Sequence, residues 1–141
     1  MKYKAVIFDL GGTLMRKQTG AERTNVQVRM ADALLISSGD FIPLWNTAFD
    51  ELMRGRSYDC QTCLRHICQQ LNVVVPDKQI ELAARIFQES VNRVVMTPRE
   101  EAFGVISSLK SAGYKIGLIS NCTSEVATAW KETSLSPLFD V

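Results

Sequence analysis

The stretch VIFDLGGTL at residues 6–14 decides how the rest of this chain is interpreted. It begins with an apolar run, reaches Asp9, and then carries two glycines, Gly11 and Gly12. A short apolar run of this kind predicts a buried parallel strand with a charged tip at its carboxyl end. In open α/β sheets ligands bind at that end, and glycines there let the backbone approach a ligand closely. By itself, the stretch fits equally well a capping aspartate in a glycine-rich turn.

A second apolar run, KIGLI at residues 115–119, ends in the same way at Ser120 and Asn121. Residues 120–124 are rich in hydroxyl groups and lead into a helix predicted around Val126 and Trp130. Such a segment can bind an anion, although N-capping hydroxyls are the commoner explanation. A carboxylate beside an anion site makes chemical sense if a metal ion lies between them, or if the carboxylate attacks a bound phosphoryl group.

The segment between these two runs has the periodicity of amphipathic helices. Five helices are expected, running from Thr24 to Gly39, from an Asp40 cap to Gly55, over about 59–71, from an Asp77 cap to about 95, and from Thr97 to Gly113. The first opens on a capping box formed by Thr24 and Gln27, and the last on Thr97, Pro98 and Glu100. The apolar residues of this last helix would be Phe103, Ile106 and Leu109.

This order of elements predicts an α/β fold with a Rossmann-like parallel sheet interrupted by an all-helical module. The α/β core would comprise residues 1–16 and 96–141, and the helical cap residues 17–95. Residues 134–141 read as a turn followed by the first residues of a third strand. The core is therefore expected to be incomplete.

Composition excludes several classes of function. The net charge is +1 over 141 residues, so no long-range field would hold a nucleic acid or an anionic membrane. No stretch approaches the roughly 20 apolar residues that a membrane span needs, and no signal peptide is recognisable. We therefore expect a cytoplasmic protein with reduced cysteines.

Three of the four cysteines, Cys60, Cys63 and Cys68, lie close to His66, the one histidine of the chain. The spacing could suggest zinc, but the cysteines share a helical stripe with Leu64 and Ile67. Buried free cysteine behaves as a small hydrophobe, and a tetrahedral zinc site usually needs a second pair of ligands. We therefore interpret this stripe as helix core, and Cys122 as an inert packing cysteine.

The two strand tips also carry a family resemblance. VIFDLGGTL resembles the first signature of the haloacid dehalogenase superfamily and KIGLISN the second, while the helical insertion is similar to that superfamily's type-1 cap. The resemblance implies a Mg2+-dependent phosphohydrolase acting on a small phosphorylated metabolite. Asp9 would be both the nucleophile that forms an aspartyl phosphate and a Mg2+ ligand, with the Gly11 carbonyl as a second ligand. Thr13, Ser120 and the Asn121 amide would bind the phosphate.

Two departures from the family pattern limit this expectation. Phosphatases of the family carry a second Asp where this chain has Gly11, and its loss removes an acid–base contribution of about 10²–10⁴-fold. The third and fourth signatures would lie beyond Val141, so we expect a truncated, inactive chain whose exposed core edge could support a dimer. The alternatives are a non-catalytic binding protein of the same fold and, less favoured, a C–halogen hydrolase, whose leaving halide needs no proton.

The residues that choose the substrate are harder to predict. Trp45, Phe49 and Arg54 could line the cleft between cap and core, although aromatic residues at helical spacing are more often core.

Overall fold

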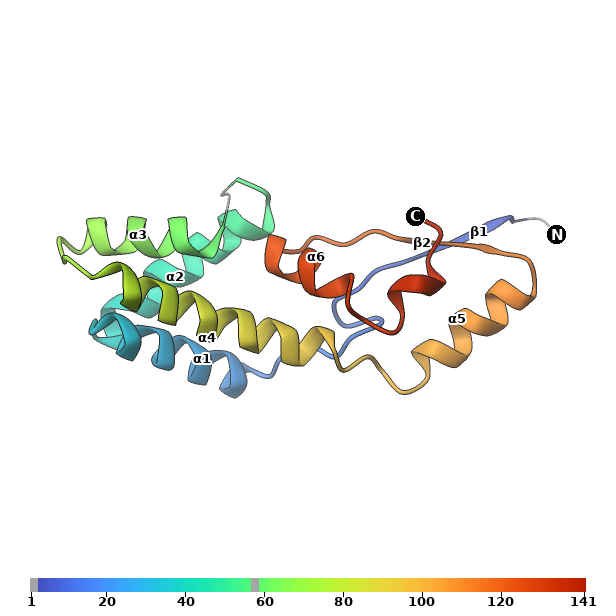
Figure 1. Cartoon of the computed structure of the whole chain (residues 1–141), viewed down its shortest axis with the longest axis horizontal. Coiled ribbons are helices and arrows are strands. Elements are labelled where there is room, and N and C mark those ends of the chain that lie inside the picture. Colours follow the sequence, from blue (N-terminus) through green and yellow to red (C-terminus); the bar gives the residue numbers. More distant parts are fainter. Residues whose placement is uncertain (1–2, 57–58) are drawn as a thin grey trace.

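The computed structural model describes residues 3–56 and 59–141. Its elements follow in the order β1 (Ala5–Phe8), α1 (Gly20–Leu34), α2 (Ser38–Met53), α3 (Cys60–Gln70), α4 (Asp77–Val95), α5 (Ala102–Ser111), β2 (Lys115–Leu118), α6 (Ser124–Trp130) and the 3-10 turn η1 (Ser136–Leu138). Helices α1–α4 form one lobe, and β1, β2 and α5 lie in the other (Figure 1). The predicted α/β fold with an inserted helical cap is confirmed. No described helix is long and apolar enough to cross a membrane.

Strands β1 and β2 pair in parallel, with Ala5 opposite Lys115 and Phe8 opposite Leu118. The N–H of Ile119 donates to the Phe8 carbonyl at 2.9 Å, which extends the pairing to the strand tips. At the other edge of β2, the Leu118 N–H donates to the Val141 carbonyl at 2.9 Å. The chain end therefore begins to pair with β2 as a third strand would.

Among the described residues, side chains cover only one face of the sheet. Val6 and Phe8 of β1 pack with Ile116 of β2 and with Ile106 and Leu135. On the opposite face Ile7 is 62% exposed and Ile119 is 68% exposed. An uncovered face of this kind leaves apolar surface in contact with water.

The cap has a hydrophobic core of its own, built from α1–α4. Met30, Phe41, Leu64 and Ile80 lie at its centre and are almost completely buried. Cys60, Cys63 and Cys68 are buried in the same cluster, whereas His66 is exposed. The interpretation of the cysteine stripe as helix core is confirmed. The proposed boundaries near residues 16 and 96 stay a prediction.

The start of α1 differs from the prediction. The helix begins at Gly20 with Thr19 as its N-cap, and Thr24 lies inside it. Glu22 donates its N–H to the Thr19 hydroxyl at 3.1 Å and accepts the Thr19 N–H at 2.8 Å. The pattern at Thr19 and Glu22 thus forms the capping box that was predicted five residues later. The helix ends at Leu34, with Leu35 in the left-handed region, well before Gly39.

The starts of three other helices also differ. Ser37, not Asp40, caps α2, and Gly39 lies within that helix. Pro76 precedes α4, so Asp77 is its first residue and not its cap. Helix α5 begins at Ala102 without a side-chain cap.

The late start of α5 has a clear cause. Pro98 is paired with Met15 across a short antiparallel bridge, and the Arg99 N–H donates to the Leu14 carbonyl at 2.8 Å. Residues 98–99 are therefore held extended beside the first loop and cannot start a helix. Helix α5 buries Ala102 and Ile106, whereas Phe103, which was expected on its apolar face, is 53% exposed.

Candidate functional site

The loop after β1 is closed on itself by backbone hydrogen bonds. The Leu10 carbonyl accepts from the N–H groups of Leu14 at 3.0 Å and Met15 at 3.1 Å, and the Gly12 N–H donates to the Met15 carbonyl at 2.7 Å. Gly12 has a φ of +87°, a conformation in which a side chain would be strained. The loop therefore holds a fixed shape directly after Asp9.

Asp9 lies exposed at the tip of β1. The Thr13 hydroxyl donates to the Asp9 carboxylate across a long contact of 3.4 Å. Because Ile119 bonds back to Phe8, Asp9 and Ser120 leave the sheet at the same carboxyl edge. The two predicted strand tips are thus neighbours in the fold.

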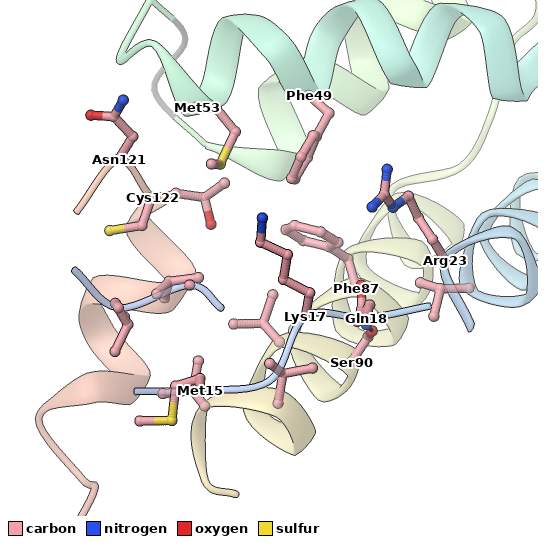
Figure 2. Close-up of a pocket in the computed structure, with 18 of the residues that line it drawn as sticks. Met15, Lys17, Gln18, Arg23, Phe49, Met53, Phe87, Ser90, Asn121 and Cys122 are labelled. Carbon is pink, nitrogen blue, oxygen red and sulfur yellow. Dashed lines mark hydrogen bonds between the residues drawn. The ribbon is translucent and has the colours of Figure 1, made fainter. Parts of the chain in front are cut away.

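A cavity of about 490 Å³ lies between the cap and the core. Pockets of roughly 300–1,000 Å³ are typical of small-molecule sites. The core contributes Leu10, Gly11, Met15, Ser120, Asn121, Cys122, Thr123 and Val126, the cap contributes Val26, Gln27, Trp45, Asn46, Phe49, Asp50, Met53, Phe87, Ser90, Val91, Val94 and Val95, and residues 16–18 and Arg23 line the junction. Figure 2 shows several of these side chains around the open space.

The predicted site residues divide into two groups in relation to this cavity. Gly11, Ser120 and Asn121 line it. Asp9 and Thr13 are not among its lining residues and lie beside it, in contact with each other. The structure therefore brings the predicted phosphate-binding residues of the second strand to the cavity and leaves the proposed nucleophile at its margin.

The cavity carries positive charge that the sequence did not reveal. Arg16 is held by Glu22 through two contacts of 2.8 and 2.9 Å, but Lys17 and Arg23 form no ion pair with any acid of the described residues. Asp50 is the one acidic side chain that lines the cavity within the described part of the chain. Lys17 and Arg23 were missed because nothing in the local pattern separates them from surface cations.

Of the cap residues suggested by the sequence, Trp45 and Phe49 do line the cavity, whereas Arg54 does not. Met53 and Phe87 line it as well and were not predicted. Both follow the helical spacing of the residues around them, so only the folded packing of α2 against α4 reveals that they face the cavity.

Thr123 also borders the cavity, and it is only 2% exposed. It precedes α6, yet its side chain makes no capping bond, and its hydroxyl oxygen has no hydrogen-bond partner among the described residues. A buried hydroxyl without a partner costs about 1–3 kcal/mol. The predicted capping role of this hydroxyl cluster therefore does not hold for Thr123.

The half-buried Cys122 beside the cavity and the buried Cys60 are poor nucleophiles. Burial raises the pKa of the Cys122 thiol, and it does so more strongly for Cys60 at the start of α3. A thiol with a raised pKa is mostly protonated at neutral pH and reacts slowly. This agrees with the interpretation of Cys122 as a packing residue.

The donors predicted for Mg2+ are the Asp9 carboxylate and the Gly11 carbonyl. Within residues 3–56 and 59–141 no group of three or more His, Cys, Asp or Glu side chains could hold a metal ion. Mg2+ keeps several waters and is often held by one or two carboxylates together with substrate phosphate oxygens. Asp9 and Gly11 thus fit Mg2+ in donor chemistry, as part of a ligand set that substrate and water would complete.

The sequence profile of haloacid dehalogenase-like hydrolases matches residues 3–141. The chain belongs to the haloacid dehalogenase-like hydrolase family. The membership expected from the two strand tips is confirmed. No curated protein gives a significant sequence match to this family member.

Solved structures of other haloacid dehalogenase-like proteins share this fold. YfnB from Bacillus subtilis, assigned as a HAD-hydrolase and bound to magnesium, superposes with a TM-score of 0.57 at 13% identity over 98% of this chain and 63% of its own. L-2-haloacid dehalogenase from Xanthobacter autotrophicus, with covalently bound chloropropionic acid, superposes with a TM-score of 0.50 at 22% identity, over 97% of this chain and 54% of its own. The L-2-haloacid dehalogenase RSc1362 superposes with a TM-score of 0.52 at 22% identity, over 97% of this chain and 61% of its own. At these identities the likeness concerns the fold alone, and the chain spans less than two thirds of each protein.

Proposed function

We propose that Asp9 is the nucleophile of a Mg2+-dependent phosphate-monoester hydrolase. The observation that supports the proposal is the parallel register of β1 and β2, in which Asp9 and Ser120 both follow strand ends at one sheet edge beside the cavity. Membership of the haloacid dehalogenase-like family supports the same assignment.

In this proposal, an Asp9 carboxylate oxygen attacks the phosphorus atom, and the bond from phosphorus to the ester oxygen breaks. Water then hydrolyses the aspartyl phosphate, which releases phosphate and restores Asp9. The Ser120 hydroxyl and the Asn121 N–H would bind the phosphoryl oxygens, and Thr13 would orient the Asp9 carboxylate. Mg2+, held by Asp9 and the Gly11 carbonyl, would neutralise charge on the phosphoryl group.

Gly11 sets a limit on the leaving group. It has no side chain that can protonate the departing oxygen, and general acid catalysis is worth about 10²–10⁴-fold. Aryl phosphates, whose leaving groups need little protonation, should therefore react faster than alkyl phosphates. The physiological substrate is expected to be a small phosphorylated metabolite with a stable leaving group, or one that supplies the proton itself.

The same glycine favours a second candidate, the hydrolysis of a C–halogen bond. A halide leaves without a proton, so the absence of an acid at position 11 is no handicap for that reaction. Asp9 would then attack carbon and form an ester in place of an acyl phosphate. The fold likeness to L-2-haloacid dehalogenases does not decide between the two reactions, because it extends equally to other hydrolases of the fold.

Activity assays can separate the two reactions. They use the intact protein, meaning a full-length form that carries all four family signatures. We expect turnover of an aryl phosphate that depends on Mg2+ and is lost in Asp9→Asn. Turnover that is indifferent to Asp9→Asn would exclude the proposed nucleophile. Chloride release from 2-chloropropionate, without phosphatase activity, would establish the halogen chemistry, and a folded protein inactive in both assays would support a non-catalytic binding role.

We also propose a cytoplasmic location. All four cysteines are free in the structure, which suits a reducing compartment. Cell fractionation, with recovery of the protein in the membrane or extracellular fraction, would contradict this proposal.

A further inference from the structure

Lys17 and Arg23 face the cavity without forming an ion pair with a described acid, and these two cations suggest which substrates the site selects. Both belong to the segment that leaves the core and starts α1, so both lie at the border of cap and core. Figure 2 shows the Lys17 side chain extending toward Met53 and Phe49, and the Arg23 guanidinium turned toward the same space. Two cations that form no ion pair with a described acid make the cavity favourable for an anion.

Gly12 leaves the space that the Lys17 side chain occupies. A Cβ atom built on Gly12 would lie 2.6 Å from Cε of Lys17 and 3.2 Å from its Cγ. The aliphatic stem of Lys17 therefore lies directly over the loop that follows Asp9, in space that any other residue at position 12 would fill. The Lys17 side chain therefore runs from this loop into the cavity, which it lines.

The wall contributed by the cap is aromatic. The rings of Trp45 and Phe87 pack edge to face with centroids 5.2 Å apart, and those of Phe49 and Phe87 do so at 6.2 Å. Trp45 is 3% exposed and Phe87 is 7% exposed, so both rings are fixed in the cap core, and the half-buried ring of Phe49 offers the larger aromatic surface to the cavity. Rigid aromatic surfaces of this kind favour an apolar or aromatic ligand body.

We infer that the cavity selects a phosphate ester whose leaving group has a compact apolar body and a second anionic group, with Lys17 and Arg23 binding that second group. The inference rests on the proposed function, in which Ser120 and Asn121 bind the phosphoryl end. The aromatic wall then receives the body of the leaving group, and the two cations receive its second charge. The Asp50 carboxylate, which also lines the cavity, would repel an anionic leaving group. Lys17 and Arg23 must together outweigh this repulsion.

The test compares two probes that differ by one charge, phenyl phosphate and 4-carboxyphenyl phosphate. Calorimetric titration of the unmodified protein in EDTA avoids turnover, because the proposed hydrolysis needs Mg2+, and it keeps the Asp9 carboxylate in place. A charge-assisted contact predicts that the carboxylated probe binds about tenfold more tightly. Lys17→Met and Arg23→Gln should each reduce that preference several-fold, while Arg29→Gln, an exposed α1 residue that does not line the cavity, should keep it.

Equal affinity for the two probes, no binding of either, or a preference unchanged in both variants would overturn the inference. Because Lys17 and Arg23 are exposed, the variants should fold normally, and circular dichroism checks this. The binding result is independent of turnover. A protein that prefers the carboxylated probe but never hydrolyses an ester would support the inference and contradict the proposed function. A protein that hydrolyses the ester without preferring the carboxylated probe would support the proposed function and contradict the inference.

Discussion

At the scale of single residues, Gly11 has the greatest effect on the chemistry available to Asp9. Gly11 does not have the positive φ that Gly12, Gly55 and Gly113 have, and a Cβ atom built on it would meet no atom within 4 Å. A side chain could therefore be added there without strain, in contrast to Gly12, whose space is filled by Lys17. Gly11 removes an acid–base group without being required by the shape of the loop.

This leads to a test by substitution. Gly11→Asp in the intact protein should raise turnover of alkyl phosphates by about 10²-fold, because a carboxyl group at this position can protonate the leaving oxygen. Steady-state kinetics with an alkyl and an aryl phosphate measure the effect, which should be smaller for the aryl ester. Gly11→Asn, similar in size but unable to transfer the proton, is the matched control. Unchanged rates in Gly11→Asp would mean that the proton comes from elsewhere.

At the scale of secondary-structure elements, both described strands and the existence of the described α-helices could be predicted, but most helix starts and the 3-10 helix η1 could not. Both strands were placed within a few residues because apolar runs end abruptly at Asp9 and Ser120. The start of α1 was misplaced because two capping patterns compete, and the box at Thr19 and Glu22 gains an ion pair with Arg16 that the sequence does not show. The start of α5 depends on the contact of residues 98–99 with the first loop, 80 residues away or more.

The capping box of α1 predicts a specific dependence on pH. The hydrogen bond from Arg16, together with the Thr19 N–H, lowers the pKa of Glu22 from 4.5 to about 2. A carboxyl group with a lowered pKa stabilises the fold above its unfolded pKa, and that contribution is lost as pH falls. Urea unfolding should therefore show a loss of stability between pH 4.5 and about 2 that is smaller in Glu22→Gln. Because both groups are exposed, the difference should shrink in high salt.

Glu89→Gln provides the control for this measurement, since Glu89 is an exposed α4 residue outside the described ion pairs. A pH profile of Glu22→Gln that matches the unmodified protein throughout the acid range would contradict the role assigned to the Arg16–Glu22 pair.

At the scale of the whole molecule, the sequence predicted which strand tips meet but not what faces them. Asp9 and Ser120 could be located because parallel strands bring their carboxyl ends to one edge. Lys17, Arg23 and Phe87 could not, because their place in the cavity depends on how α1, α2 and α4 pack and on the angle at which the cap meets the core. In the described part of the chain, one face of the sheet also lacks a covering element.

The uncovered face predicts self-association of the 141-residue chain. Ile7 and Ile119 are 62% and 68% exposed on this face, and removing such apolar surface from water favours association. Sedimentation velocity should show association that grows with concentration and is reduced by Ile7→Lys. Val74→Lys, at a fully exposed position in the cap, should leave it unchanged. A monomer at every concentration would show that the face does not act as a contact.

The central claim is that Asp9 attacks the substrate, and trapping the covalent intermediate tests it most directly. The intact protein, mixed with an aryl phosphate and Mg2+ and quenched in acid during turnover, should carry one phosphoryl group. Mass spectrometry of the peptide around residues 6–14 should locate that group on Asp9, and Asp9→Asn should carry none. A turning-over enzyme with no phosphoryl group on Asp9, or with one on another residue, would contradict the account.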